Sequence, residues 1–564
     1  MSSGREILTF QFGNYANQIG AHWWNIQESG FSYDGQTDLH EVCHDVLYRE
    51  GLNLNKQTTF TPRLLLVDLD GAQKHLPIEG ELYGDSVKRV FNGDSEADNP
   101  LKKLKDELEW KDTEFEIREE PEAKKNEFQM DVDNPEVNYE EKQYELATSA
   151  ETWADFLYAR YHPRTVNVIK EYKFAPEKQA VDTFSAGVLL WKTEQFEDAF
   201  CDKIRQYVEE CDYMQGFQTI FDVFNGFSGL ASRCVEHLYD EYGKTNLALP
   251  VFAPKTVLFE NADEPMTETI RVVNSALAFN GLIEHSSMFV PLSTQDRVWR
   301  QLGSARSMAS LNYQGDNLYQ TSAILAAYID TISLRYRLKS GTASNSLAGL
   351  CSDLTNHGRK LSAAALALPF PMQHDVDLID CLDTFEGRLF TQLTPNCTIG
   401  SDYVIQSLCV RGIPSNRVKR PLEQAKLQMH MAAYKCDNVS EMFQLYLQCA
   451  NHASMSHVTS ASSALPTRTP FPVEMFAETV NADGFLSLHK REPSEKVKSV
   501  PTIASVQSSS ALGDTMEALH RETKRVKIAK MHRFLAAGLE ADEFEDVLEN
   551  LLLFKDNYED NFEL

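Results

Sequence analysis

The opening segment of the chain constrains its fold more than any other stretch. Residues 6–12 (EILTFQF) are rich in β-branched and aromatic side chains and predict a strand. Gly13 and Asn14 break this pattern, and residues 17–28 (NQIGAHWWNIQE) have the apolar spacing of a helix. A strand, a short turn and a helix in this order predict an α/β sheet with a loop that faces a ligand.

Strands and helices continue to alternate along the rest of the chain. Residues 63–69 (RLLLVDL) form a near-continuous apolar run, which suits a buried parallel strand. Residues 208–243 predict a helix, a short strand, a glycine-bearing loop and a second helix, and residues 317–338 predict a long buried helix. The pattern is that of an α/β protein with more than one structural unit.

Two segments depart from this alternation. Residues from about 84 to 151 mix charges of both signs with little apolar periodicity, so we predict a surface insertion that is part helix and part disorder. Residues 499–510 are rich in serine and predict a linker, which is followed from Thr515 by a charged helical region.

The net charge of −29 limits the partners of the chain. A phosphate backbone or an anionic lipid surface would repel so acidic a protein, which argues against nucleic acid and against unaided membrane binding. The longest apolar run, residues 361–370, falls short of the ~20 residues that a membrane span needs. We therefore expect an acidic cytosolic protein, with a basic partner docked on an acidic face as the alternative.

The ten cysteines include no C-x-x-C pair. Cysteines scattered through a chain of this length indicate reduced thiols rather than a disulfide framework or a zinc site. No histidine pair is assigned to a metal, and the glycines around Ser228 do not have the spacing of a nucleophile elbow. The sequence therefore predicts neither a metal site nor a serine nucleophile.

Several short motifs resemble the tubulins, in tubulin order. They are residues 5–20 (REI, then GNYANQIG), 62–71 (PRLLLVDLDG), 211–218 (CDYMQGFQ), 353–371 (D, then PFP), 410–412 (VRG) and 532–544 (HRF, then GL and EF). Finer features resemble the Misato family of the tubulin superfamily, among them residues 21–25 (AHWWN), 162–164 (HPR) and 209–213 (EECDY).

This resemblance implies a tubulin-like α/β fold. Its expected parts are a Rossmann-like N-terminal domain of the nucleotide-binding type at residues 1–310, a central helix at 311–338, an α/β intermediate domain at 339–498, and the Ser-rich linker with C-terminal helices at 499–564. The acidic insertion interrupts the first of these parts.

The resemblance also implies where GTP would bind. In tubulins the N–H groups of glycine-rich loops surround the phosphates, and side chains read the guanine. The matching candidates here are Asn14, Asn17, Gln18, Asp70, Gly226, Ser228 and Gly229. Asn14 keeps an amide near the phosphates, Gln18 is placed to meet a base, and Asp70 replaces the glutamate near the metal.

Several positions next to these candidates differ from the tubulin residues. The loop at residues 224–230 (FNGFSGL) keeps two glycines where the tubulin phosphate loop has five, and its phenylalanines add bulk. Glycine matters in such a loop because it permits positive φ and a close approach of the backbone to phosphate. Tyr15 and Ala16 replace a cysteine and a glycine of the first loop. Two interpretations stay open: filling of a former pocket, or retained but altered GTP binding.

The guanine end allows two registers. In direct register Gln314 replaces the stacking tyrosine and Leu318 replaces the base-reading asparagine. A slip of one residue restores Tyr313 and Asn317 to these roles. Arg271 stands at the position of the acidic ribose contact.

Hydrolysis is a separate question. In tubulin filaments the next subunit supplies an acidic residue that activates water. Asn356 stands at the matching position, and an amide is no general base near neutral pH. Asp353 is interpreted as an N-cap or a surface acid. The resemblance therefore implies no polymerisation-coupled GTPase activity.

Two functions are weighed. The first is a non-enzymatic protein of mitochondrial distribution, morphology and fusion, with a further role in microtubule and spindle assembly and in chromosome segregation. It would act in the cytoplasm and on the outer surface of the mitochondrion, by binding tubulin, tubulin-folding chaperones or mitochondrial surface proteins. The alternative is a GTP-binding tubulin-like GTPase that assembles with itself.

Overall fold

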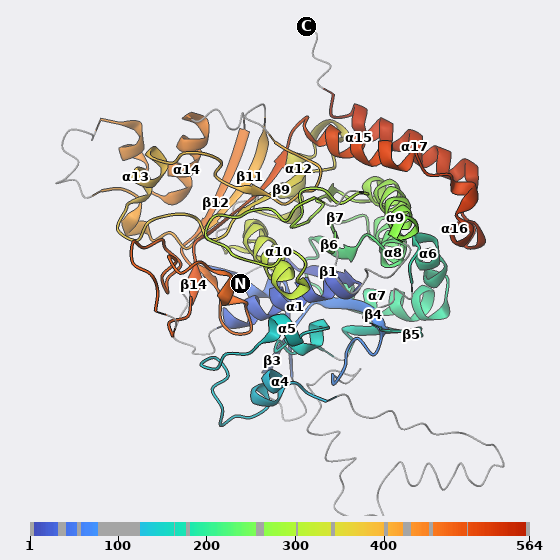
Figure 1. Cartoon of the computed structure of the whole chain (residues 1–564), viewed down its shortest axis with the longest axis horizontal. Helices are drawn as coiled ribbons and strands as arrows, with labels where there is room; N and C mark the ends of the chain where they lie inside the picture. Colours follow the sequence, from blue (N-terminus) through green and yellow to red (C-terminus); the bar gives the residue numbers. More distant parts are fainter. Residues whose placement is uncertain are drawn as a thin grey trace, which may run out of the picture.

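A computed structural model gives the arrangement of most of the chain (Figure 1). It describes residues 5–31, 41–52, 58–76, 124–162, 164–175, 181–254, 264–300, 303–339, 345–399, 404–420, 430–449, 455–492 and 494–559. The elements below are those of these residues.

The N-terminal sheet has six strands in the order β5-β4-β1-β6-β7-β8, and every pairing in it is parallel. Its strands are β1 (Ile7–Phe12), β4 (Leu64–Asp70), β5 (Val166–Lys173), β6 (Gly216–Asp222), β7 (Thr245–Val251) and β8 (Met288–Phe289). β1 and β4 confirm the two strands predicted first. The continuous apolar run in β4 is explained by its burial, since six of its seven residues are buried.

Helices cover both faces of this sheet, because successive side chains of a strand point to opposite sides. Leu8, Phe10 and Phe12 of β1 pack in the core that contains α8 (Phe227–Tyr242) and α9 (Glu264–His285). Ile7 belongs to the other core, beside α1 and α10. The remaining helices of this half are α4 (Glu127–Val132), α5 (Leu146–Ser149), α6 (Phe184–Trp191) and α7 (Cys201–Glu209), and β2 (Tyr48–Leu52) pairs with β3 (Thr58–Pro62).

The central helix lies between the two halves of the molecule (Figure 1). α1 (Asn14–Ser29) packs against α10 (Leu318–Ile332), which α11 (Leu334–Arg337) continues. Every residue of α10 except Leu318 is buried, and Ala323, Ala326 and Ala327 are fully so. Small side chains at these positions allow α10 to approach both α1 and the second sheet.

The second sheet has five strands in the order β10-β9-β15-β11-β12. Its strands are β9 (Ala363–Ala367), β10 (Thr391–Gln392), β11 (Ile405–Arg411), β12 (Met455–Ala461) and β15 (Thr502–Ser508). The helices nearby are α12 (Leu347–Leu354), α13 (Leu378–Asp383) and α14 (Val439–Cys449), and β13 (Leu465–Pro466) pairs with β14 (Ser499–Val500). The C-terminal helices are α15 (Leu512–Thr523), α16 (His532–Ala536) and α17 (Ala541–Asp556). The predicted α/β fold class is thereby confirmed.

The predicted serine-rich linker is wrong. Residues 502–508 form β15, the middle strand of the second sheet, and all seven are buried. Small hydroxyl side chains fit here because neighbouring strands satisfy them: the Ser505 hydroxyl donates to Gln406 Oε1 over 3.2 Å. The serine content suggested a loop. The strand is in the core because Ile503, Ala504 and Val506 are buried apolar residues.

The last part of the predicted surface insertion contains the short helices α4 and α5 and is anchored at a few buried residues. Phe128 of α4 is 1% exposed, and Gln129 Nε2 donates to the backbone oxygens of Ala154 and Leu157 over 2.9 Å each. Phe128, Gln129 and Leu146 are the buried residues of segment 124–151, and most of its other residues are exposed. Residues 84–123 of the predicted insertion lie outside the described residues.

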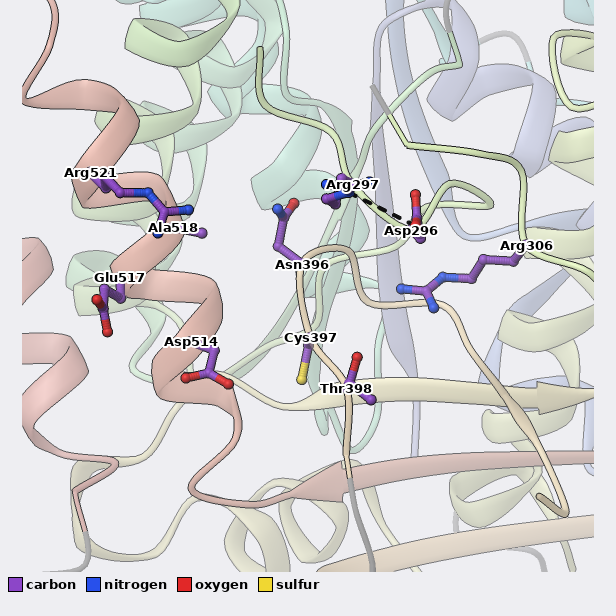
Figure 2. Close-up of a pocket in the computed structure, with 10 residues that line it drawn as sticks. All are labelled: Asp296, Arg297, Arg306, Asn396, Cys397, Thr398, Asp514, Glu517, Ala518 and Arg521. Carbon is purple, nitrogen blue, oxygen red and sulfur yellow. Dashed lines mark ion pairs between the residues drawn. The ribbon is translucent and has the colours of Figure 1, made fainter. Parts of the chain in front are cut away.

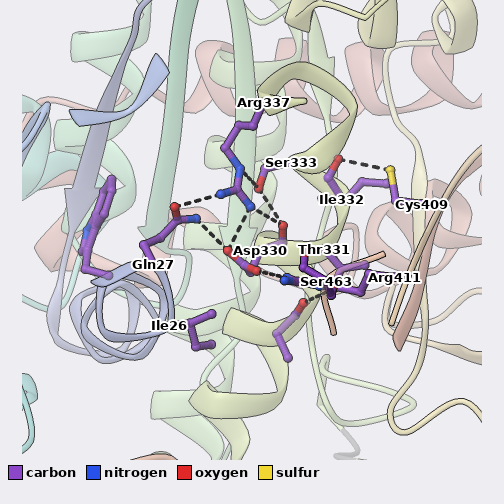
Figure 3. Close-up of polar contacts among 12 residues, drawn as sticks. Ile26, Gln27, Asp330, Thr331, Ile332, Ser333, Arg337, Cys409, Arg411 and Ser463 are labelled. Carbon is purple, nitrogen blue, oxygen red and sulfur yellow. Dashed lines mark hydrogen bonds and ion pairs between the residues drawn. The ribbon is translucent and has the colours of Figure 1, made fainter. Parts of the chain in front are cut away.

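A buried polar cluster joins the two halves through the central helix (Figure 3). The Asp330 carboxylate of α10 accepts from Gln27 of α1 over 2.6 Å and from Arg337 over 2.9 Å. Its other oxygen accepts from Arg411 of β11, whose Nε donates to the Ser463 backbone oxygen. Burial lowers the pKa of Arg411. A single carboxylate thus connects the first helix, the central helix and the second sheet.

Candidate functional site

The seven predicted GTP-site residues come together at one edge of the N-terminal sheet. Asn14, Asn17 and Gln18 lie in the first turns of α1 after β1, and Asp70 ends β4. Gly226, Ser228 and Gly229 lie at the start of α8 after β6. The carboxyl edge of a parallel sheet is where such folds bind ligands. The placement fits the predicted site, but the roles of these residues stay predictions.

The side-chain amide of Asn17 donates hydrogen bonds to other residues of the protein. Its Nδ2 donates to Asp68 Oδ2 over 2.9 Å and to the Val67 backbone oxygen over 3.1 Å. The Trp153 indole donates to the same Asp68 oxygen over 2.9 Å. Burial raises the pKa of Asp68 to about 6, although these donors oppose the rise. Sequence reasoning missed Asp68; its signal is a carboxylate within an otherwise apolar strand.

The side-chain oxygens of Asn14 and Asn17 are buried and have no hydrogen-bond partner. Both atoms are acceptors, so they call for a donor or a cation. Phosphate oxygens are acceptors as well at neutral pH, and they would leave these two atoms unsatisfied. A bare phosphate would therefore not satisfy these two atoms, whereas a cation bound with it would.

Three N–H groups of the loop after β6 donate to acceptors within the protein. Gly226 N donates to the Val181 backbone oxygen over 3.0 Å, and Phe227 N donates to Asn225 Oδ1 over 3.1 Å. Ser228 donates to the Asn225 backbone oxygen twice, from its N–H over 3.2 Å and from its hydroxyl over 2.7 Å. A phosphate loop works by offering such donors to the ligand. These donors are already taken.

The glycines of this loop serve helix packing. Gly226 has φ −67°, so it does not need the positive φ expected of a phosphate loop. A Cβ on Gly229 would lie 1.9 Å from the Phe184 backbone oxygen, and one on Gly187 would lie 1.7 Å from the Gly226 oxygen. Glycine is needed here because α6 and α8 approach backbone to backbone. This packing fits a filled pocket, one of the two interpretations that the sequence leaves open.

Residues of α9 hold the same loop from the other side. Asn274 Nδ2 donates to the backbone oxygens of Asp182 over 2.7 Å and Phe224 over 2.9 Å, and its Oδ1 accepts from Phe184 N over 2.7 Å. The Arg271 guanidinium lies 5.0 Å from the centre of the Phe224 ring. Arg271, predicted at the ribose contact, thus packs on a loop phenylalanine. These contacts and the packing of α6 hold the loop after β6 against the protein.

Of the two registers of the guanine end, the slipped one places its residues in internal contacts. Tyr313 donates its hydroxyl to the Arg306 backbone oxygen over 2.7 Å. Asn317 caps α10, because its Oδ1 accepts from Gln320 N over 3.0 Å. Gln314 is exposed, and Leu318 is half-buried at the start of the helix. Asn317 and Tyr313 therefore have structural partners in the absence of a base.

Asp353, three residues before the position matched to the water-activating acid, makes an ion pair. Asp353 lies in the last turn of α12, whose N-cap is Ser346, so the N-cap interpretation of Asp353 was wrong. Arg335 Nη2 donates to Asp353 Oδ2 over 2.6 Å; the arginine side chain is 0% exposed and the aspartate 45%. Asn356 is exposed in the following turn. Asp353 thus acts as the counter-ion of a buried guanidinium.

A cavity lined by charged side chains lies elsewhere (Figure 2). It has a volume of about 460 Å³ and lies between α15 and the segments that follow β8 and β10. Arg297 and Arg306 line one side, and Asp514 and Glu517 of α15 line another. None of the seven predicted residues lines it.

A histidine pattern was overlooked in the sequence. Residues 40–44 (HEVCH) match H-E-x-x-H, which binds zinc when both histidines lie on one helix face. The described part of this segment is not such a helix: Val42 forms a β-bridge with Leu338, and Glu41 accepts from the Ser462 hydroxyl over 2.9 Å. His44 stacks on Phe31, with ring centres 4.1 Å apart. His40 lies outside the described residues.

Three further observations concern the described residues alone. They contain no group of three or more histidines, cysteines and carboxylates placed to hold a metal ion. None of their helices is long and apolar enough to cross a membrane. All ten cysteines are free thiols.

The parallel six-stranded sheet and the loops at its carboxyl edge define a tubulin-like α/β protein, and a sequence model of the tubulin domain matches residues 144–338. A model of the Misato Segment II tubulin-like domain matches residues 5–134. The chain is 44% identical to Protein misato of Drosophila melanogaster over the full length of both. It is 31% identical to Protein misato homolog 1 of Danio rerio (97% of this chain, 95% of the relative) and 30% identical to that of Homo sapiens (97% and 96%). The chain belongs to the Misato family.

Proposed function

We propose that this chain is a non-enzymatic member of the Misato family that acts in mitochondrial distribution, morphology and fusion. A further role lies in microtubule and spindle assembly and in chromosome segregation. The protein works in the cytoplasm and at the outer surface of the mitochondrion by binding protein partners. These partners are tubulin, tubulin-folding chaperones or mitochondrial surface proteins.

The observation that carries the non-enzymatic part is the internal bonding of the loop after β6. Binding a phosphate there would require Gly226, Phe227 and Ser228 to give up the hydrogen bonds that their N–H groups now make. It would also require α6 to move, because Gly229 lies against the Phe184 backbone. Each exchanged hydrogen bond is worth about 1 kcal/mol net, and a displaced helix contact costs more. GTP is therefore not assigned as a cofactor.

Binding of partners is supported by the fold and the charge. Asp353 pairs with Arg335 and Asn356 replaces an acid, so the surface that would complete a neighbour's GTPase site lacks a free carboxylate at these two positions. A tubulin-like frame without this chemistry still offers large surfaces, and a net charge of −29 favours basic partners.

The cellular role is tested by rapid degradation of the endogenous protein, followed by imaging of mitochondria and spindles. Loss should disturb mitochondrial distribution and delay spindle assembly. Wild-type protein and Asp353→Asn, expressed at equal levels, should both restore normal cells, because the asparagine oxygen still accepts from Arg335. Unchanged mitochondria and spindles after degradation would contradict the proposed role. Failure of Asp353→Asn at a normal protein level would favour the GTPase alternative.

A further inference from the structure

Asp222 lies directly beneath the N-terminus of α1. It is the last residue of β6, and its side chain is 6% exposed. Its Oδ1 accepts from Ala16 N over 2.8 Å, and its Oδ2 accepts from Tyr15 N over 3.2 Å. Both carboxyl oxygens are therefore bonded to the first turn of the helix.

The first turn of a helix is an anion site, because its N–H groups lack partners within the helix and its dipole favours negative charge. In a sheet of this kind, that turn faces the ligand edge. Here the chain supplies the acceptor itself, from the end of the neighbouring strand. Of the N–H groups of the first turn, those of Tyr15 and Ala16 are occupied.

Gly13 is fitted to this arrangement. Its φ is 99°, and a Cβ there would lie 2.5 Å from Asp222 Oδ2. Its backbone oxygen accepts from Asn17 N over 2.9 Å, which continues the helix. Glycine is therefore needed both for the backbone turn and for the room that the carboxyl group occupies. The contact between Asp222 and α1 thus depends on the residue type at position 13.

We infer that the Asp222 carboxyl group fills the anion position at the start of α1, where a nucleotide phosphate would otherwise bind, and so determines that this site rejects phosphate. Asp68 of β4 is a second carboxylate beside it, so an incoming phosphate would meet like charge as well as occupied donors. The inference rests on the proposed function in one respect, that no nucleotide is required. Beyond the proposed function, it identifies Asp222 as the residue that excludes phosphate from this site.

Chemical rescue tests the inference. Asp222→Ala removes the carboxyl group and leaves a space of the shape of formate. We expect the purified full chain with Asp222→Ala to unfold at a lower temperature than wild type at pH 6, which lies below the raised pKa of Asp222 of about 7. Replacing about 0.1 M chloride by the same concentration of formate should recover part of this loss in unfolding temperature. A weak anion site fills at about this salt concentration. Wild type should respond equally to both salts.

Leu230→Ala is the matched control. Leu230 is 0% exposed in the adjoining helix α8, so its truncation destabilises the protein through an apolar space that formate does not fill. Formate should therefore give this variant no advantage over chloride. Equal effects of formate on both variants, or no effect on Asp222→Ala, would overturn the inference.

Asp222→Asn provides a second measurement if Asp222→Ala does not fold. The asparagine keeps one acceptor for Ala16 but presents an N–H₂ group to Tyr15. Hydrogen–deuterium exchange in the peptide spanning residues 13–20 should become faster than in wild type, while the peptides of α17 keep their rates. Unchanged exchange at residues 13–20 would overturn the inference. Unchanged exchange leaves the proposed function standing, whereas GTP binding by wild type would contradict the proposed function as well, so the two failures are distinguishable.

Discussion

The Asp330 carboxylate of the central helix accepts a hydrogen bond from Arg411 at the end of β11, and both side chains are buried. The same carboxylate accepts from Gln27 of α1 and from Arg337. The two halves of the fold therefore meet at a charged contact as well as at an apolar one. The tubulin-like frame is held together independently of the loops at the ligand edge.

Asp330→Ala should destabilise the whole chain. It leaves Arg337 and Arg411 buried without their shared carboxylate, and breaking such a contact costs about 3–5 kcal/mol. Denaturant unfolding should show this loss in the free energy of unfolding. Asp316→Ala, on the exposed segment before α10, should change it by less than about 0.5 kcal/mol. Equal stability of Asp330→Ala and wild type would show that the cluster does not join the halves.

Gly229→Ala should destabilise the contact between α6 and α8. The added methyl group would meet the Phe184 backbone oxygen, and overpacking of this kind costs about 1–3 kcal/mol. Gly51→Ala is the control, because a Cβ there would meet its nearest atom, on Thr59, at 3.4 Å. Thermal unfolding should separate the two variants. If Gly229→Ala is as stable as wild type, then this glycine is not required for helix packing.

Stability should depend on the ionisation of Asp222. Burial first, and the nearby Asp68 as well, raise the pKa of Asp222 to about 7, against the opposing bonds from Ala16, Tyr15 and Asn225. Between the ordinary carboxyl pKa and pH 7 the folded state then binds more protons than the unfolded state. Its free energy of unfolding therefore falls as the pH rises through this window.

Denaturant titrations of wild type and Asp222→Asn from pH 4 to pH 8 measure this dependence. Groups common to both proteins, such as the buried His22 with its lowered pKa of about 3, cancel in the difference. The stability of wild type relative to the variant should decline with rising pH by up to several kcal/mol. A difference that stays constant or grows with pH would contradict the burial of an ionisable carboxyl group here.

Much of the frame could be predicted because its signals are local. The apolar runs of β1 and β4 and the small residues of α10 specify buried strands and a close-packed helix without knowledge of their neighbours. β15 was missed because its serines resemble a linker until the neighbouring strands that accept their hydroxyl groups are known.

The site was harder to predict because its meaning depends on distant contacts. Gly226 and Gly229 look like remnants of a phosphate loop, and only the approach of α6 shows that they serve packing. Asp68 and Asp222 lie inside apolar strands, where a carboxylate is a signal that sequence reasoning passed over. Their partners on α1 and Trp153 belong to segments far away in the sequence.

We propose that a tubulin-like frame has been kept without a working GTP site. Equilibrium dialysis of the purified full chain against labelled GTP with Mg²⁺ tests it most directly, with phosphate release measured over a range of protein concentrations. We predict no saturable binding in the micromolar range and no release that rises with protein concentration. Micromolar or tighter binding, with turnover that increases as the protein is concentrated, would contradict the claim.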